Sequence, residues 1–452
     1  MMKRKFKLST THIILLSFLV TIALGSVLLA LPISSASGTP VPYLDALFTA
    51  TTSTCVTGLV TLPTASTWSI FGQIVILLLI QIGGLGIITI MSGVMLLLNR
   101  KLGISDNLLI QDAFNLNTLS GLSKFIKKVL LGTFIIEGIG AILYMIVFVP
   151  EFGAKGIWIS VFTSVSAFCN AGIDIIGENS LCNYSTNLLI NLVTSALIIL
   201  GGIGYIVWWD VLRVLKNRTS KNKKIFSHLT LHTKIALTAT LCLIVAGATL
   251  IFAFEYSNPL TIGNMSTFDK IQVSLFQSVT TRTAGFASVP QENLTNASSA
   301  VSLLLMLIGG SPVGTAGGMK TVTIVVLICS AIATVKNKNS ATLFGRCISE
   351  DSIRKAVAVS VVFVSICFAS TVLLMASSDA SALDVIYESV SATATVGLSR
   401  GFTSSMNTLG RIIIIVTMYL GRVGPISLAL ALGSKNKSQN IISEPTETIS
   451  IG

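Results

Sequence analysis

Four short stretches of small, hydroxyl-bearing residues and glycine recur at a nearly constant interval along this chain. They read "TSTCVTGLV", "SVSAFCNAGID", "SVTTRTAGF" and "SATATVGLSRG", and their aligned glycines are Gly58, Gly172, Gly285 and Gly397. The glycines lie 114, 113 and 112 residues apart, which indicates an internal repeat. Glycine allows a backbone to turn successive carbonyl oxygens to one side, and such oxygens can replace the hydration shell of a cation. The pattern therefore predicts cation coordination by four backbone segments.

The composition places these stretches in a membrane protein. Hydrophobic residues make up 52% of the 452 and charged residues only 11%, with a mean hydropathy of +0.84. The net charge of +12 could suggest a nucleic-acid partner, but 23 of the 30 Lys and Arg fall in the termini and in three loops. Five are assigned to the opposite side, namely Lys155, Lys270, Arg282, Arg400 and Arg411. This positive-inside pattern argues against nucleic acid and predicts cytoplasmic termini.

Eight apolar stretches are long enough to span a bilayer as helices. They lie near residues 12–31, 69–98, 128–149, 187–212, 235–254, 300–333, 356–376 and 409–432. The first is interpreted as a retained span, because no convincing signal-peptidase site follows it. A shorter apolar segment that ends in a glycine motif separates the two spans of each pair. Two spans per repeat give all four repeats the same orientation, so the predicted symmetry axis is the membrane normal.

The predicted fold is thus all-α and integral to the membrane, with four parallel helix–pore loop–helix repeats arranged pseudo-fourfold around one central pore. The expected repeats are 1–98, 128–212, 235–333 (with a broken second helix) and 356–432. Cytoplasmic loops at 99–127, 213–234 and 334–355 connect them, and a tail follows at 433–452.

The four glycine motifs resemble the filter motifs of the KtrB/TrkH/HKT superfamily of potassium transporters, and the likeness runs from residue 12 to the C-terminus. The eight-span length is most similar to KtrB, the membrane subunit of the bacterial Ktr uptake system. The resemblance implies a single-chain version of the potassium-channel fold, usually dimeric, in the bacterial plasma membrane. It implies a K⁺ filter made of Thr57, Gly58, Asn170, Ala171, Gly172, Ala284, Gly285, Val396 and Gly397. Plant relatives with serine in the first motif favour sodium, so Gly58 argues for potassium.

The sixth apolar stretch is interrupted by "GGSPVGTAGGMK" at 309–320. Proline and glycine cannot continue a helix there, and irregular backbone survives at membrane depth only beside protein or a water-filled cavity. The stretch predicts a loop across the pore, and similar intramembrane loops occur in KtrB-like chains. A phosphate-binding loop is disfavoured because Met319 stands where GxxxxGK[ST] needs glycine. A kink used only for packing is the serious alternative.

An arginine within the last apolar stretch, Arg422, supports the gate interpretation. It is costly in a membrane unless it faces a cavity or a partner. Gly309 and Gly421 each lie 24 residues after their motif glycines, so Arg422 should reach the depth of the loop and its carbonyl groups. The family resemblance also implies an arginine here. The expected gate comprises Gly309, Gly310, Ser311, Pro312, Gly314, Thr315, Gly317, Gly318, Lys320 and Arg422.

Several acidic residues are expected to gather on the external side and concentrate cations. They are Asp45, Asp174, Glu178, Asp269, Glu292, Asp384 and Glu388. Two others lie in or near spans: Glu137 is a candidate for an ion or proton relay, and Asp210 is expected to pair with Arg213 at the interface.

The sequence predicts K⁺ uptake through a gated four-glycine filter, with Na⁺- or H⁺-coupled K⁺ symport as the alternative. An alternating-access transporter of an organic solute is more distant, and no enzyme or organic cofactor is expected. K⁺ is the transported ion and Na⁺ a candidate activator. The resemblance implies a homodimer and a cytosolic RCK-type nucleotide-binding ring, similar to KtrA or KtrC, that docks on the cytoplasmic loops.

Overall fold

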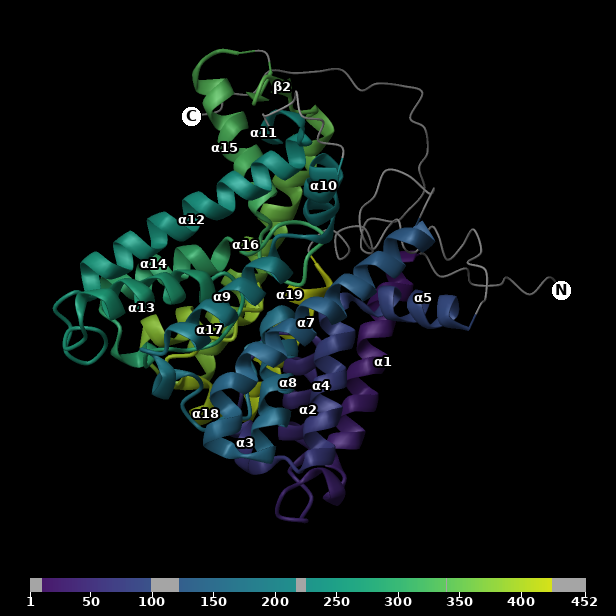
Figure 1. Cartoon of the computed structure of the whole chain (residues 1–452). Helices are drawn as coiled ribbons and strands as arrows, with labels where there is room; N and C mark the ends of the chain where they lie inside the picture. Colours follow the sequence, from purple (N-terminus) through teal and green to yellow (C-terminus); the bar gives the residue numbers. More distant parts are fainter. Residues whose placement is uncertain (1–9, 99–121, 217–224, 339, 425–452) are drawn as a thin grey trace.

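The computed structural model describes residues 10–98, 122–216, 225–338 and 340–424, which are almost entirely helical (Figure 1). Within these ranges the β-structure is one antiparallel hairpin, β1 (Thr342–Leu343) with β2 (Arg346–Cys347), and two isolated bridges. Much of the expected first cytoplasmic loop and all of the expected tail 433–452 lie outside the described residues.

The long elements fall into four successive groups of three helices. In each group a long helix is followed by a short helix that packs against it and ends at one of the glycine motifs; a third helix then follows. The long helices are α1 (Thr10–Ala30), α7 (Leu122–Phe152), α12 (Leu231–Glu255) and α16 (Glu350–Ser377). The short helices are α2 (Tyr43–Thr54), α8 (Ala154–Phe168), α13 (Thr267–Thr280) and α17 (Ala382–Ala394). The third helices are α4 (Ile70–Leu85), α9 (Leu188–Gly202), α14 (Asn296–Leu307) and α19 (Thr408–Val423).

The described residues expose many large apolar side chains, as a membrane protein does and a water-soluble protein does not. Large apolar side chains are exposed along the long helices, for example Leu24, Ile142 and Phe368. Hydroxyl groups are buried in the interior, mainly at the ends of the four short helices. An apolar outer surface on helices of this length is what lipid contact requires.

Each third helix begins at a residue that caps it. Ser69, Asn187, Thr295 and Asn407 precede these four helices, and each accepts a hydrogen bond from a backbone N–H in the first turn. Such caps satisfy donors that the helix itself cannot satisfy. The chain can therefore reverse direction after each glycine motif and start a new helix.

The third helices end earlier than the sequence predicts. The expected spans 69–98 and 187–212 are not continuous helices, because the chain bends by 98° between α4 and α5 (Ile87–Leu97) and by 95° between α9 and α10 (Tyr205–Lys216). Gly86 and Gly204 stand at these bends with φ of 83° and 93°, a conformation that ends a right-handed helix. Gly424, after α19, has the same conformation with a φ of 93°.

By length and composition, four helices of the described ranges can cross a membrane, or six if each bent pair counts as one span. They are α1, α7, α12, α16 and the pairs α4–α5 and α9–α10. The remaining third helices, α14 and α19, are 12 and 16 residues long. Part of the expected last span, 425–432, lies outside the described residues.

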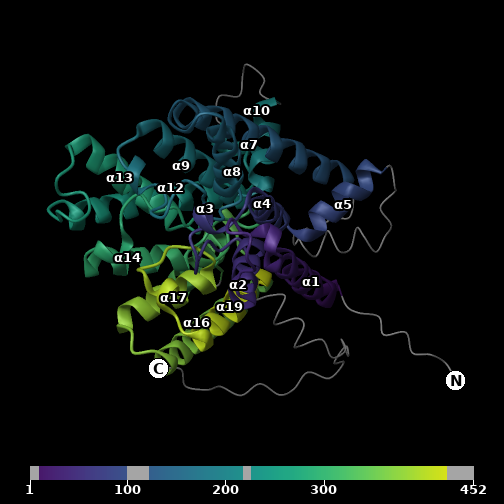
Figure 2. The ribbon, with the colours of Figure 1, turned by 90° about the horizontal axis from the view of Figure 1, so that it is seen from below.

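The last group of helices closes against the first. Figure 2 draws α16, α17 and α19 beside α1 and α2, and α19 contacts both α1 and α2. The short helices α3 (Thr64–Thr67) and α18 (Phe402–Ser405) lie at one end of the molecule in Figure 1. At the other end lie α11 (Ile225–His228), α15 (Thr321–Val335) and the hairpin. The 3-10 turns are η1 (Pro32–Ser34), η2 (Cys182–Tyr184) and η3 (Gln291–Asn293).

Candidate functional site

Four non-helical segments, here called the glycine strands, follow the four short helices. They are residues 55–58, 169–172, 282–285 and 395–397. In each strand the motif glycine has a positive φ, and so does the residue two positions earlier. These earlier residues are Val56, Asn170, Thr283 and Thr395, with φ between 52° and 64°. Left-handed backbone at non-glycine residues is strained, and its recurrence in four strands marks a shape that the surroundings impose.

The four motif glycines meet in a closed cycle. A Cβ built on each glycine would lie closer than van der Waals contact to the carbonyl oxygen of the residue that precedes the next motif glycine. The distances are 2.4 Å from Gly58 to Ala171 O, 2.5 Å from Gly172 to Ala284 O, 2.6 Å from Gly285 to Val396 O, and 2.2 Å from Gly397 to Thr57 O. The structure therefore brings together eight of the nine residues expected in the filter, and the ninth, Asn170, directly precedes Ala171. Any side chain at the glycines would displace a neighbouring carbonyl.

Hydroxyl groups near the ends of the short helices anchor these strands. The amide of Gly58 donates to Thr52 Oγ1 at 3.0 Å, and the amide of Gly397 donates to Ser391 Oγ at 3.0 Å. In the second group the amide of Ile173 donates to Ser166 Oγ at 3.1 Å. Because the backbone N–H groups are satisfied behind the strands, their carbonyls remain available on the other side. Sequence reasoning missed this anchoring.

The third strand is anchored differently. Thr280 Oγ1 donates to the carbonyl of Phe286 at 2.7 Å, and the carbonyl of Thr280 accepts from the amide of Ala284 at 3.0 Å. All four short helices end at their strand with no basic residue in the last turn. The partly negative carbonyl end of each short helix thus lies directly before its glycine strand, which favours a cation nearby.

A second set of glycines, in the third helices α4, α9 and α19, provides close packing. Gly83, Gly201 and Gly421 each face the end of the short helix of their own group, where a Cβ would lie 1.9, 1.9 and 2.1 Å from a carbonyl oxygen. In the third group the matching Gly309 instead faces Gly317 of the interrupting loop, with a Cβ distance of 2.1 Å.

The loop between α14 and α15 is closed at its base and docked on the second group. The amide of Gly309 donates to Met319 O at 2.9 Å, which joins the two ends of the loop. The amide of Ser311 donates to Gly202 O at 2.8 Å, and that of Thr315 donates to Gly201 O at 3.1 Å. Tyr205, beyond the α9–α10 bend, donates its amide to Val313 O at 2.9 Å. The bend at Gly204 therefore creates the surface on which the loop lies.

The same loop contacts the inner ends of three glycine strands. Thr315 Oγ1 donates to the carbonyl of Phe168 at 3.0 Å, next to the second strand. The amide of Gly317 donates to Thr283 Oγ1 of the third strand at 3.2 Å. A Cβ on Gly317 would lie 1.9 Å from Thr395 Oγ1 of the fourth strand. The remaining loop residues of the expected gate, Gly310, Pro312, Gly314 and Gly318, pack against Gly202, Gly204, Gly201 and Gly309 respectively.

Arg422 joins this loop to the first group. Its guanidinium donates to Thr315 O at 2.6 Å and to Gly83 O at 2.5 Å. The described residues place no carboxylate within ion-pair distance of it. Lys320, at the other end of the loop, donates from Nζ to Ala316 O at 2.6 Å. Both cations expected in the gate thus bind loop carbonyls.

A third cation near the loop corrects a sequence assignment. Arg282 was expected on the external side, but its side chain is buried and donates to Gly309 O at 3.2 Å and to Thr240 Oγ1 at 3.4 Å. The reason is that α13 ends inside the protein, so the residues following it are at the depth of the glycine strands.

The expected cluster of external carboxylates is also partly wrong. Glu388 lies in α17 and is fully buried. Asp45 and Asp384 are engaged with arginines: Arg411 donates to Asp45 at 2.6 Å and Arg400 donates to Asp384 at 2.8 Å. Through these ion pairs the two carboxylates stabilise the packing of the short helices. Their partners are distant in sequence, so sequence alone could not identify them.

The two other acidic candidates have distinct surroundings. Asp210 forms the expected ion pair with Arg213, and it also accepts from the amide of Thr230 at 2.8 Å at the start of α12. Glu137 is buried in α7, where Gln81 Nε2 donates to both of its carboxyl oxygens at 3.1 and 3.2 Å. It lies behind the second glycine strand, with Cys169 Sγ 3.9 Å from Oε1.

Comparisons with known proteins agree on one family. The family described as TrkH, cation transport protein, matches residues 3–443. The chain is 38% identical to the potassium/sodium uptake protein NtpJ of Enterococcus hirae, covering 99% of this chain and 98% of that protein. It is 39% identical to Ktr system potassium uptake protein B of Bacillus subtilis, covering 95% and 94%. The crystal structure of the potassium transporter TrkH from Vibrio parahaemolyticus has the same fold, with a TM-score of 0.75, 16% identity, and coverage of 96% of this chain and 86% of that one.

Proposed function

This chain belongs to the TrkH family of cation transport proteins and is a multi-pass membrane protein, and on that premise we propose that it is the K⁺-translocating subunit of a Ktr-type uptake system. The observation that carries the proposal is the closed cycle of four motif glycines, each in contact with the carbonyl that precedes the next. Its membrane is proposed to be the bacterial plasma membrane, with both termini in the cytoplasm.

The proposed filter consists of the carbonyl groups of the four glycine strands. Their amides are hydrogen-bonded on the side of the short helices, and the helix ends add negative potential between the strands. A dehydrated cation would exchange water for these carbonyls, which is how K⁺ is selected in channels. Four unlike strands around one axis correspond to the proposed pseudo-fourfold arrangement of the repeats that begin at residues 1, 128, 235 and 356.

The proposed gate is the loop at 309–320 together with Arg422. Its contacts with Phe168, Thr283 and Thr395 support a position directly at the inner ends of the strands. A guanidinium at this place also repels cations. Opening would require release of Thr315 O from Arg422 and movement of the loop away from the strands.

Coupled K⁺ symport with Na⁺ or H⁺ remains the second candidate, and Glu137 is the observation that favours it. A buried carboxyl group behind a filter strand, held by Gln81, can exchange a proton or pair with a sodium ion. If the protein is a symporter, Glu137→Gln should abolish the dependence of K⁺ flux on the second ion while K⁺ flux itself remains. If it is a uniporter, the same substitution should leave the ion dependence of the flux unchanged.

Regulation is proposed to come from other subunits. Relatives are named as parts of a Ktr system, which supports a membrane subunit that works with other components. We propose that these are a second copy of this chain and a cytosolic RCK-type ring that binds through the cytoplasmic loops. In this scheme Na⁺ is a candidate activator, and the chain itself binds no organic cofactor.

Uptake of radioactive Rb⁺ into proteoliposomes tests the filter. External K⁺ should block uptake by the wild type, and Gly285→Ser should weaken that block because its Cβ would lie 2.6 Å from Val396 O. Gly138→Ser is the matched control, since Gly138 in α7 has open space around it. Wild-type uptake that K⁺ does not block, or a Gly285→Ser variant identical to the control, would contradict the proposal.

A further inference from the structure

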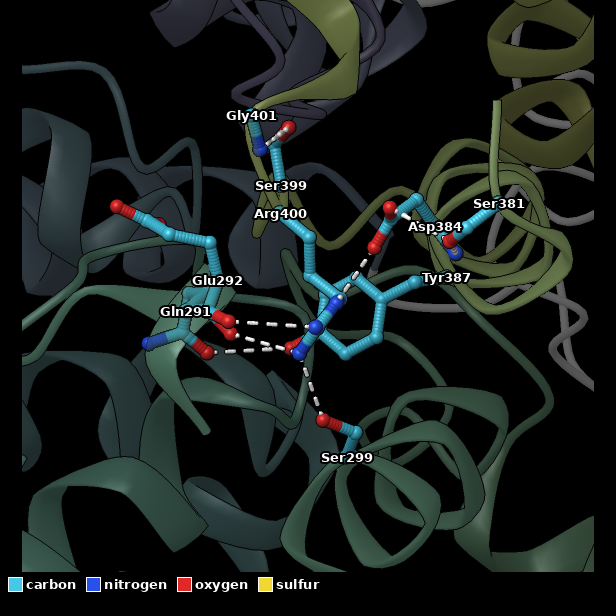
Figure 3. Close-up of polar contacts among 9 residues, drawn as sticks. All are labelled: Gln291, Glu292, Ser299, Ser381, Asp384, Tyr387, Ser399, Arg400 and Gly401. Atoms are coloured by element: carbon cyan, nitrogen blue, oxygen red, sulfur yellow. Dashed lines mark hydrogen bonds and ion pairs between the residues drawn. The ribbon is translucent and has the colours of Figure 1, made fainter. Parts of the chain in front are cut away.

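The side chain of Arg400 bridges the third and fourth groups beside the outer ends of their glycine strands (Figure 3). It follows Gly397 by three residues, and its side chain is only 11% exposed. The guanidinium donates to Asp384 Oδ1 at 2.8 Å, Ser299 Oγ at 2.8 Å, Gln291 O at 3.0 Å and Glu292 O at 3.3 Å. These partners belong to α17, α14 and η3, so one side chain joins three elements.

The ion pair with Asp384 orients the guanidinium. Asp384 lies in the first turn of α17, where the helix end favours a carboxylate, and Ser381 Oγ donates to its other oxygen at 2.6 Å. A carboxylate held on both sides leaves the arginine little rotational freedom. The planar fork of the guanidinium is thereby directed at the two η3 carbonyls.

Gln291, whose carbonyl Arg400 binds, links two short helices through its own side chain. Tyr387 of α17 donates from its hydroxyl to Gln291 Oε1 at 3.1 Å. Gln277 of α13 donates to the same oxygen at 2.6 Å and accepts from Gln291 Nε2 at 3.2 Å. All three side chains are buried. This bridge sets the separation of α13 and α17, which carry the third and fourth glycine strands.

The two strands carried by these helices are in direct contact. A Cβ on Gly285 would lie 2.6 Å from Val396 O and 3.3 Å from Gly397 Cα. A small change in the separation of α13 and α17 would therefore reach the carbonyls themselves. Because K⁺ and Na⁺ differ in radius by a fraction of an ångström, such a change alters which ion the carbonyls fit.

We propose that Arg400 is a positioning residue that sets the preference for K⁺ over Na⁺ by holding the Gln291 bridge between α13 and α17. The inference rests on the proposed filter function and adds a specificity determinant outside the glycine strands. Arg400 does not touch the ion; it acts through η3 and the two short helices.

The test compares Arg400→Lys with wild type in Rb⁺ uptake under competition by K⁺ and by Na⁺. Lysine keeps the charge near Asp384 but cannot reach Ser299 and both η3 carbonyls at once. The ratio of Na⁺ to K⁺ inhibition constants should fall about tenfold, the effect of losing a hydrogen bond of a charged group. Arg354→Lys, on an exposed arginine of α16 with its side chain 83% exposed, is the matched control and should leave the ratio unchanged.

A second variant keeps the test decisive if Arg400→Lys does not fold. Ser299→Ala removes one acceptor from Arg400 and leaves the ion pair, so the ratio should again fall about tenfold, in protein that elutes as wild type on size exclusion. A ratio unchanged in Ser299→Ala overturns the inference, whether Arg400→Lys is unchanged or inactive. If K⁺ fails to block wild-type uptake, the proposed function itself fails, which is a distinguishable result.

Discussion

Replacement of Arg422 by alanine should increase ion flux through the protein. The guanidinium donates to Thr315 O in the loop and to Gly83 O in α4, and the described residues offer it no compensating carboxylate. Alanine removes both bonds, and it also removes a positive charge from the proposed cation path. Each change favours conduction, so the expected direction is a gain of basal uptake.

The magnitude follows from the two hydrogen bonds. A bond from a charged donor contributes about 1.5 kcal/mol at the low end of its range, so two contribute about 3 kcal/mol to the closed loop. That free energy changes the closed-to-open ratio by about 100-fold. A loop that is open about 1% of the time would then be open about half of the time. Arg422→Lys, which can reach one of the two carbonyls, should give about a tenfold change.

The assay is Rb⁺ uptake into proteoliposomes that contain no regulatory subunit, measured at equal protein content by quantitative blotting. Initial rates of the Arg422→Ala, Arg422→Lys and wild-type proteins are compared, with Arg354→Ala as a control on an exposed arginine. The initial rate of uptake should be highest for Arg422→Ala, lower for Arg422→Lys and lowest for wild type, and the control should equal wild type. If the Arg422→Ala variant assembles correctly but its uptake is equal to or below that of wild type, Arg422 does not hold the loop closed.

Three further outcomes are expected. Gly317→Ala should also raise basal uptake, by severalfold, because its Cβ would lie 1.9 Å from Thr395 Oγ1 and would push the loop away from the strand; unchanged uptake would place the loop elsewhere. Asp45→Ala should lower the free energy of unfolding by about 3 kcal/mol, since it leaves Arg411 partly buried without its partner, and a thermal-shift assay in detergent without a drop would contradict this. Burial raises the pKa of Asp174, so the folded state is favoured while this carboxyl is protonated, and stability should fall as pH rises above about 3.9, the ordinary value for aspartate. Asp174→Asn should remove that part of the pH dependence of thermal stability, and identical profiles would refute the assignment.

Local chemistry explains why several features were predictable from sequence. The glycine strands recur at a constant interval, and left-handed backbone at the motif positions needs glycine wherever the helices lie. The interruption at 309–320 is predictable for a similar reason, since proline and clustered glycine end a helix in any context. The pairing of Asp210 with Arg213 was within reach because three residues on one helix bring the side chains together.

Other features depended on partners that are distant in sequence. The bends at Gly86 and Gly204 were missed because glycines inside an apolar stretch are common packing sites in membrane helices. Arg282 was assigned to the wrong side because the depth at which α13 ends is a matter of packing. The anchoring roles of Thr52 and Ser391 required the strand to fold back on its own helix.

The sequence by itself determined which stretches are apolar enough for lipid, that the helix is interrupted at 309–320, and which motif positions must be glycine. These properties depend on hydropathy and on backbone sterics, which act within a few residues. Only the tertiary structure decided which group contacts which, as in the donation from Arg422 to Thr315 and Gly83, or from Arg400 to Ser299. Those contacts join residues about 100 to 340 positions apart, and their geometry arises from the packing of helices around a common centre.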